Sequence, residues 1–318
     1  MKNLVLNELV KIFSRAGTYV MIGLIAVLVM GMAGLSKYEE YDSPPKENPH
    51  WKAELEKQIV NDQASLENFG KNNSNLVQFY KREIAIKEYR ILHDMAPPAG
   101  MHVWSFVGDA KSFISFVGLF AIVIAAGIVS SEFSWGTIKL LLIRPIARWK
   151  ILLSKYLAVL VFGVGLLTLL FVFSLLVGII LFGLPDQPAP HLVYTGGHVV
   201  EQNIALQLIA EYLLSSIDIL MVATMAFMIS AVFRNSSLAI GISLFLLLTG
   251  STLTMLLAGR FEWTKYFLFA NTNLTVYLDG TPPIPGMTLG FSIMILFLYF
   301  TIFHLLAFLI FSKRDVAA

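Results

Sequence analysis

Six apolar stretches, each long enough to cross a bilayer as a helix, divide this chain of 318 residues. A hydrocarbon core about 30 Å thick needs roughly 20 apolar residues of helix, and each stretch has about that length or more. The third stretch is too long for one perpendicular span, so we expect it to tilt or to extend past the membrane. The pattern predicts an all-α, polytopic membrane protein whose six transmembrane helices cover residues 17–35, 109–129, 151–183, 204–232, 238–258 and 287–311.

Composition supports the same fold class and argues against several functions. Apolar residues make up 57% of the chain and charged residues 14%, and the mean hydropathy is +0.72, whereas soluble proteins carry about 25% charged residues. The formal charge of +2 is too small to suggest a nucleic-acid partner. The chain has no cysteine and its six histidines are scattered, so we expect no disulfide, no metal site and no cysteine nucleophile.

Basic residues are distributed unevenly between the two sides of the predicted spans. The termini and short loops on one side carry eleven Lys and Arg against three acidic residues, whereas segment 36–108 on the other side carries nine basic and eleven acidic residues. In membrane proteins the cytoplasmic loops are the ones rich in Lys and Arg. We therefore expect a multi-pass protein of the cell membrane with both termini in the cytoplasm and with lipids among its partners.

Residues 1–16 precede the first span and are expected to form a separate element. Their pattern predicts a cytoplasmic amphipathic helix along the inner membrane surface, with Lys11 near the anionic headgroups. The apolar run that follows is longer than a signal-peptide core, which suggests a retained first span. The apolar residues at helical spacing are Leu6, Leu9, Val10 and Phe13.

Segment 36–108 is too long for a slack loop and contains two stretches of helical periodicity. Residues 70–74 have the composition of a turn, and prolines bracket the pair, which predicts an antiparallel helical hairpin on the extracytoplasmic side. A lid or a partner-docking element is the simpler role, and a ligand-binding domain is the alternative. The residues expected to hold the two helices together are Leu55, Ile59, Leu66, Tyr80, Ile84 and Ile91.

The basic segment 131–155 lies between the second and third spans. Membrane topology explains its positive charge, but it does not explain the order in which an acidic residue, a glycine and a proline occur there. Ser130 or Ser131 can cap a short helix here, with Glu132 in its first turn, where negative charge suits the helix dipole. A glycine and a proline then predict a corner and a re-entry into the membrane. In order, the segment contains Glu132, Gly136, Thr137, Lys139, Arg144, Pro145, Arg148 and Lys155.

This string resembles the cytoplasmic coupling segment of type-2 (ABC-2, ABCG-like) ABC transporter permeases. The spacing of the six spans and the residues Asn7, Glu8 and Lys11 support the resemblance. It implies that residues 1–16 form an elbow helix, that residues 259–286 form short outer helices, and that the string from Glu132 to Arg148 couples the membrane helices to an ATPase. The chain would then be the membrane subunit of an ATP-driven exporter.

The resemblance also implies partners, namely two copies of a cytoplasmic ABC ATPase and a second permease subunit, identical or homologous. The chain contains no G-x-x-x-x-G-K-[ST] loop, so ATP and its magnesium would bind to the partner ATPase. The chain itself would need no cofactor and would not be an enzyme. Export of an antimicrobial peptide, an antibiotic or a lipid-like compound is the expected function, with antibiotic resistance as one consequence.

Two carboxylates lie in the fourth predicted span, where charge is unfavourable. Glu211 and Asp218 are seven residues apart and share a helical face with Ser215. A carboxylate inside a span costs roughly 2.5–3.5 kcal/mol on insertion scales, so it should face the bundle interior. These residues either line a translocation path that attracts a cation or are tied to a neighbouring donor such as Lys111. A stand-alone secondary transporter driven by ion binding at Asp218 is the alternative function.

Overall fold

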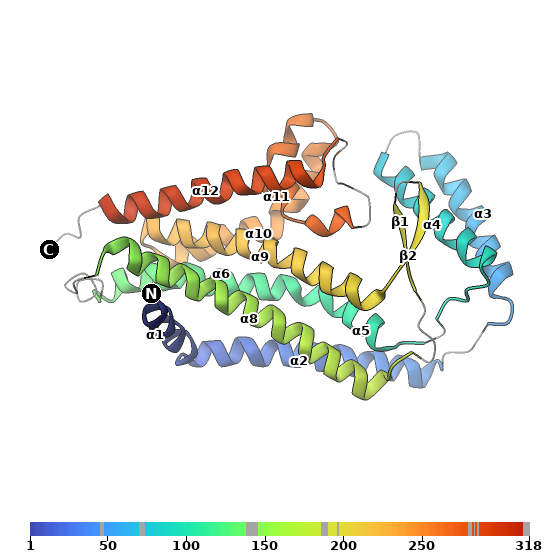
Figure 1. The fold of residues 1–318 in the computed structure, drawn as a ribbon, viewed down its shortest axis with the longest axis horizontal. Coiled ribbons are helices and arrows are strands. Elements are labelled where there is room, and N and C mark those ends of the chain that lie inside the picture. The colour runs from blue at the N-terminus through green and yellow to red at the C-terminus, as the bar shows by residue number, and fades with distance from the viewer. Residues whose placement is uncertain are drawn as a thin grey trace.

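The computed structural model describes residues 1–44, 48–69, 74–98, 100–137, 146–185, 190–195, 197–278, 282, 284 and 286–313. Helices make up most of this structure (Figure 1), which confirms the predicted all-α fold class. The long helices run along one axis of the molecule. The N-terminal helix and the end of the last helix lie at the same end of that axis.

In the described part of the chain, six helical segments are long and apolar enough to cross a membrane, as predicted. The second segment is composite, because α5 (Val103–Ala110), the 3-10 turn η1 (Lys111–Phe113) and α6 (Ile114–Ser134) follow one another without a break. The other five segments are single helices: α2 (Ala16–Asp42), α8 (Arg148–Phe182), α9 (Ile204–Phe233), α10 (Ser236–Ala258) and α12 (Leu289–Lys313).

Two helical segments extend several residues beyond the predicted spans. The first helix continues to Asp42, past residue 35, because no glycine or proline interrupts the polar residues before Pro44. The helical segment of the second span begins at Val103, before residue 109, so helix also occupies both ends of the predicted segment 36–108. Counting apolar residues finds the part of a helix that faces hydrocarbon, but it misses helical turns that continue beyond that part.

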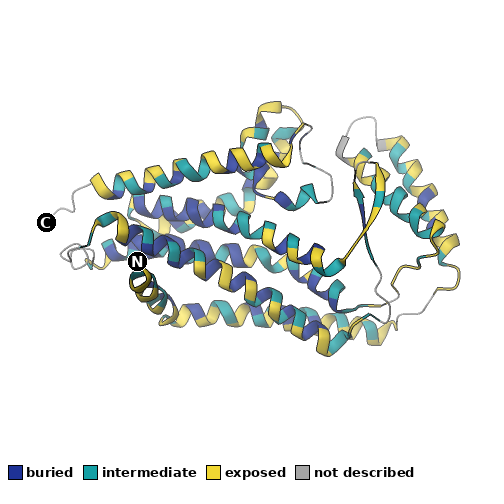
Figure 2. Cartoon of the chain, viewed as in Figure 1, coloured by how far each residue is buried: buried dark blue, intermediate teal, exposed yellow. Residues whose placement is uncertain are grey.

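The bundle is centred on α6 and α9, whose residues are buried more often than those of the other spans (Figure 2). Helix α8 packs on both of them, and Gly178 of α8 lies against Val103 and Phe106 of α5. Helices α2, α10 and α12 expose much of their apolar surface. In a bilayer such surfaces face lipid tails, which are as apolar as the side chains themselves.

At the opposite end of the molecule from the N-terminal helix, α3 (Trp51–Phe69) and α4 (Ser74–Leu92) pack together as the predicted helical hairpin. Leu55 and Ile59 are its buried apolar residues in the described part. Two short antiparallel strands, β1 (His191–Thr195) and β2 (His198–Gln202), contact α4 and were not predicted. Short runs with adjacent strand-favouring residues, Leu192-Val193-Tyr194 and Val199-Val200, flank a Gly-Gly pair and were the available signal for these two strands.

The described residues between α10 and α12 form three short helices, η2 (Glu262–Tyr266), α11 (Leu268–Asn271) and η3 (Leu274–Tyr277). The buried Asn271 holds them together. Its amide nitrogen donates to the carbonyls of Lys265 at 2.8 Å and Phe267 at 2.7 Å, and its oxygen accepts from the Ser292 hydroxyl of α12 at 2.7 Å. These bonds fix the segment against the bundle.

A close contact between Gly250 of α10 and Phe269 of α11 gives a first prediction. A Cβ atom at Gly250 would lie 2.5 Å from the Phe269 ring, whereas one at Gly241 would meet nothing within 4 Å. We expect Gly250→Ala to lower the free energy of unfolding by about 1–3 kcal/mol, because overpacking forces the ring or the helix to shift. Gly241→Ala should be neutral or slightly stabilising, since alanine favours helix.

Unfolding of the purified variants in detergent measures both effects. Adding Phe269→Leu to Gly250→Ala should recover part of the loss, because the smaller side chain makes room for the new methyl group. Equal stability of Gly250→Ala and Gly241→Ala would contradict the close contact.

Candidate functional site

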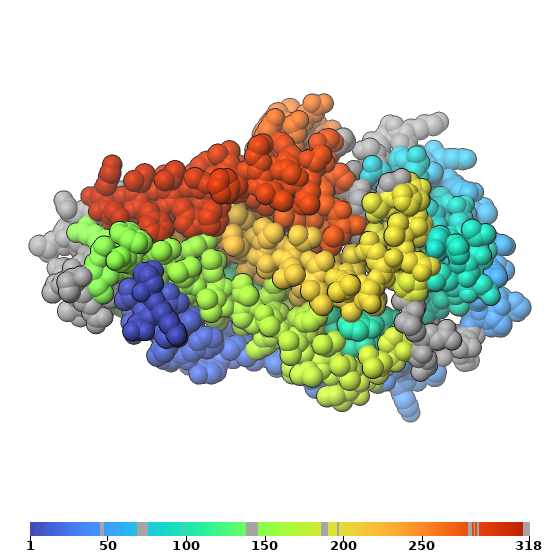
Figure 3. All heavy atoms as spheres, viewed as in Figure 1, coloured from blue at the N-terminus to red at the C-terminus, as the bar shows by residue number. Residues whose placement is uncertain are grey.

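The N-terminal helix α1 (Lys2–Phe13) lies against α8, as the dark blue and green spheres of Figure 3 show. Glu8 and Ile12 are buried, whereas Leu6 and Val10 are exposed. Most of the apolar stripe therefore faces away from the protein, as expected for a helix at a lipid surface. The side of the helix that faces the protein carries an acidic residue instead.

This acidic residue belongs to a network of four charged side chains that joins three helices. The Lys155 ammonium of α8 lies 2.8 Å from Glu8 Oε2 and 3.0 Å from Glu132 Oε1 of α6. Lys11 Nζ lies 3.0 Å from Glu8 Oε1 and 3.2 Å from Glu132 Oε1. Lys11 was predicted to lie near the lipid headgroups, and the prediction did not include these ion pairs within the protein. We name Glu8, Lys11, Glu132 and Lys155 the elbow network.

Burial makes each member of the elbow network depend on the others. The Lys155 side chain is 1% exposed, that of Glu8 6% and that of Glu132 12%, so water screens these charges little. Two ammonium groups face two carboxylates, and the charges balance. Removing one partner of a buried pair leaves an uncompensated charge, which destabilises a protein by about 3–5 kcal/mol.

Lys11 lies at the partly exposed edge of the network. Burial by itself would lower the pKa of Lys11. The hydrogen bond and the charge of Glu8, together with those of Glu132, outweigh this effect and raise the pKa above its usual value of 10.5. Lys11 therefore stays protonated throughout the physiological pH range.

Glu132 lies in the last turn of α6 and not in the first turn of a new helix, so the predicted helix start is wrong. The Ser130 hydroxyl donates to the Ala126 carbonyl at 2.6 Å and caps nothing, because α6 continues through it. The helix ends before Gly136, whose φ of +69° lies in the left-handed region that favours glycine. After this corner, the Thr137 hydroxyl donates to the Glu132 carboxylate.

The other residues of the predicted coupling string divide into two groups. Lys139, Arg144 and Pro145 lie outside the described residues. Arg148 begins α8 and donates to the Ser312 carbonyl of α12 at 3.3 Å. The structure thus brings the beginning and the end of segment 131–155 together at the elbow network, whereas Arg148 lies nearer the surface.

Several basic side chains near this end of the bundle lie over aromatic rings. Such pairs suit the headgroup region, where aromatic rings and cations meet both lipid and water. Trp135 and Trp149 are exposed, as this position requires. The pairs are Arg15 over Trp135 at 5.7 Å, Lys150 over Trp149 at 5.6 Å and Arg234 over Phe133 at 4.4 Å.

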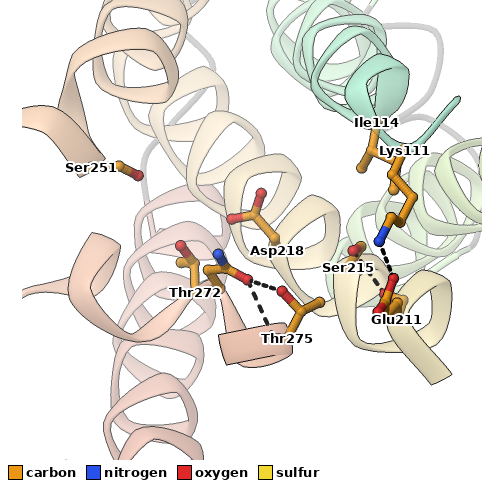
Figure 4. A pocket seen from close by; sticks show the side chains of 9 residues that line it. Lys111, Ile114, Glu211, Ser215, Asp218, Ser251, Thr272 and Thr275 are labelled. Atoms are coloured by element: carbon orange, nitrogen blue, oxygen red, sulfur yellow. Dashed lines mark hydrogen bonds and ion pairs between the residues drawn. The ribbon is translucent and has the colours of Figure 1, made fainter. Parts of the chain in front are cut away.

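A second candidate site is a polar cavity of about 360 Å³ further along the bundle toward the hairpin, which we name the outer cavity (Figure 4). Here Lys111 forms an ion pair with Glu211. A tie to a donor such as Lys111 was one of the two roles predicted for the carboxylates of this span. Asp218 lies two turns further along α9 and lines the same cavity. The predicted tie of Lys111 is therefore made to Glu211 and not to Asp218.

Sequence reasoning did not find the pairing of Lys155 with Glu8, which lies 147 residues away. One signal was present, because a lysine inside the apolar stretch 151–183 requires an acidic partner. The spacing of residues in the sequence could not identify that partner, because the partner is set by where α1 packs in the folded protein.

Comparison with known proteins gives the family. Residues 76–317, well over half of the chain, match the model of a family described as "Protein of unknown function (DUF2705)". The chain belongs to the DUF2705 family. The matched region contains Glu132, Lys155 and the outer cavity, whereas the elbow helix α1 with Glu8 and Lys11 precedes it.

Two proteins of Bacillus subtilis (strain 168) are similar to this DUF2705 protein. "Uncharacterized protein YhcI" is 52% identical over 319 residues, which cover 100% of both chains. "Uncharacterized membrane protein YdbK" is 35% identical over 198 residues, which cover 61% of this chain and 76% of the relative. Together with the six apolar helices, the second similarity identifies a multi-pass membrane protein.

The elbow network gives a second prediction. Lys155→Met should lower the free energy of unfolding by about 3–5 kcal/mol, because Glu8 and Glu132 would then share a single ammonium group. Adding Glu8→Gln should recover part of this loss, since one carboxylate and one ammonium group remain. Denaturation of the purified variants in detergent, followed by tryptophan fluorescence, measures the change.

Lys150→Met is the matched control, because Lys150 is exposed and lies outside the network. It should change stability by no more than about 0.5 kcal/mol. If Lys155→Met and Lys150→Met were equally stable, the buried ion pairs would not hold α1 in place.

Proposed function

We propose that this DUF2705 protein is the permease subunit of an ATP-driven exporter of the ABC-2 type, and that a separate chain hydrolyses the ATP. The six spans and the residue string of segment 131–155 support the proposal. The observation that carries it is the elbow network, because this network ties α1 to both ends of that segment. Glu132 lies near its beginning and Lys155 at its end.

A motor outside the membrane needs a stiff connection to the helices that it moves. The elbow network joins α1, the end of α6 and the start of α8, so a force on any of them reaches all three. Helix α8 has 35 residues and is therefore about 50 Å long. It can carry a displacement from Lys155 to Gly178, where it packs closely on α5.

The basic end of the bundle supplies the rest of the proposal. Its excess of Lys and Arg supports a cytoplasmic position for both termini and the elbow network. Two copies of an ABC ATPase would dock there and bind ATP with magnesium, so this chain would have no cofactor and no catalytic role. A second permease subunit would complete the pathway for an antimicrobial peptide, an antibiotic or a lipid-like compound.

Docking of the ATPase gives a third prediction. It is tested by co-expressing the chain with candidate ABC ATPases and purifying the complex through the permease. The double variant Arg148→Glu, Lys150→Glu should reduce the ATPase recovered by about tenfold or more, because both residues lie beside the elbow network but outside it. The permease itself should still insert and purify.

Lys81→Glu is the matched control, because this exposed lysine lies on the hairpin helix α4 at the other end of the molecule. It should leave the amount of bound ATPase unchanged. Full recovery of the ATPase with the double variant would contradict docking at segment 131–155.

An ion-coupled secondary transporter is the second candidate function. The position of Asp218 in the outer cavity, with no basic partner among the described residues, favours it. Proteoliposomes that contain this chain alone distinguish the two candidates. A secondary transporter would move substrate with an ion gradient and no nucleotide, whereas the proposed exporter would need both the ATPase and ATP.

A further inference from the structure

The outer cavity is a polar chamber in an otherwise apolar bundle (Figure 4). Its volume of about 360 Å³ lies within the roughly 300–1,000 Å³ that is typical of small-molecule sites. Side chains from the η1–α6 region, α9, α10 and the α11–η3 segment line it. Because Asn271 anchors the last of these segments to α12, the cavity has a fixed wall on that side.

One of the two carboxylates in the cavity is already neutralised. The Lys111 ammonium pairs with Glu211, and Gln207 Nε2 donates to the other Glu211 oxygen at 3.1 Å. The Ser215 hydroxyl donates to the Glu211 backbone carbonyl at 2.8 Å. Both carboxylate oxygens of Glu211 therefore have a donor, and Lys111, the one basic residue among the described lining residues, is committed to it.

Asp218 has no such cation. It lines the cavity together with Thr272. Among the described residues, no lysine, arginine or histidine forms an ion pair with it. The cavity thus holds one carboxyl group that no cation of the described residues neutralises. A carboxylate removed from bulk water is unfavourable unless a proton or a cation neutralises it.

The surroundings of Asp218 suit a cation that donates hydrogen bonds. Ser251, Thr272 and Thr275 line the cavity, and their hydroxyl oxygens can accept. Ammonium and guanidinium groups offer several N–H donors and form strong, charge-assisted bonds to carboxylates. A bare divalent metal ion prefers several oxygen ligands at short range, and it would fill little of a cavity of this volume.

We propose that the outer cavity binds the ammonium or guanidinium group of a small organic cation, with the Asp218 carboxylate as the counter-ion of that group. Lys111 has a positioning role, because it neutralises Glu211 and leaves Asp218 as the single site of attraction. That this organic cation is the exported substrate rests on the proposed function, whereas its binding does not.

The test is a fourth prediction and uses dansylcadaverine, a fluorescent primary amine, with the full chain in lipid nanodiscs and no ATPase. We expect saturable binding of this amine and at least about tenfold weaker binding of N-acetyl-dansylcadaverine, which lacks the positive charge. Guanidinium ions at low millimolar concentration should displace the probe, and sodium ions at equal ionic strength should not. Asp218→Asn should weaken probe binding about tenfold or more, and Asp218→Glu should weaken it less.

Asp109→Asn is the matched control, because Asp109 lies in α5 near the same end of the bundle but does not line the cavity. It should bind the probe as the unchanged protein does. The melting temperature of each variant shows whether it is folded. If Asp218→Asn does not fold, the comparison of the charged and acetylated probes on the unchanged protein still decides the question.

Three results would overturn the proposal: equal binding of the charged and acetylated probes, unchanged probe binding by folded Asp218→Asn, or displacement by sodium as effective as by guanidinium. Because no ATPase is present, these results concern the cation site alone. ATPase recovery through Arg148 and Lys150 tests the proposed function separately, so failure of one proposal can be told from failure of the other.

Discussion

The buried ammonium group of Lys155 is the constraint on which one whole end of this molecule depends. It lies two turns into α8 and is 1% exposed, where an unpaired charge would be very unfavourable. Its partners come from 147 residues away, at Glu8, and from 23 residues away, at Glu132. The docking of α1 on α8 and the approach of the end of α6 follow from this requirement.

The two polar sites of the bundle differ in how their charges are balanced, and this difference suits them to different tasks. The elbow network contains two cations and two carboxylates, so its charges balance and it acts as a fixed joint between helices. The outer cavity contains Lys111 and two carboxylates, so it attracts a further cation. Helices α8 and α9 both pack on α6, and together they connect the joint to the cavity.

Local sequence patterns predicted the features that depend on residues close together in the chain, such as helices and turns. The apolar stretches predicted the six spans. The predicted spans 204–232 and 238–258 left only a short gap, and α9 indeed ends at Phe233 and α10 begins at Ser236. The ion pair between Lys111 and Glu211 was among the predicted alternatives, because both residues lie near the ends of their spans on the same side of the membrane. The pairing of Lys155 with Glu8 was beyond prediction, since periodicity does not say which helices are neighbours in space.

The absence of cysteine makes a direct measurement of the elbow joint possible, because two introduced cysteines can carry spin labels without background. Labels at Asn7 of α1 and Trp149 of α8 lie at exposed positions close to the elbow network, and neither residue is among those changed in the docking test. We expect pulsed electron-spin resonance on the reconstituted complex with its ATPase to give the same distance with and without ATP, because α1 and the start of α8 move as one body. A distance that changes between the two nucleotide states would contradict this joint.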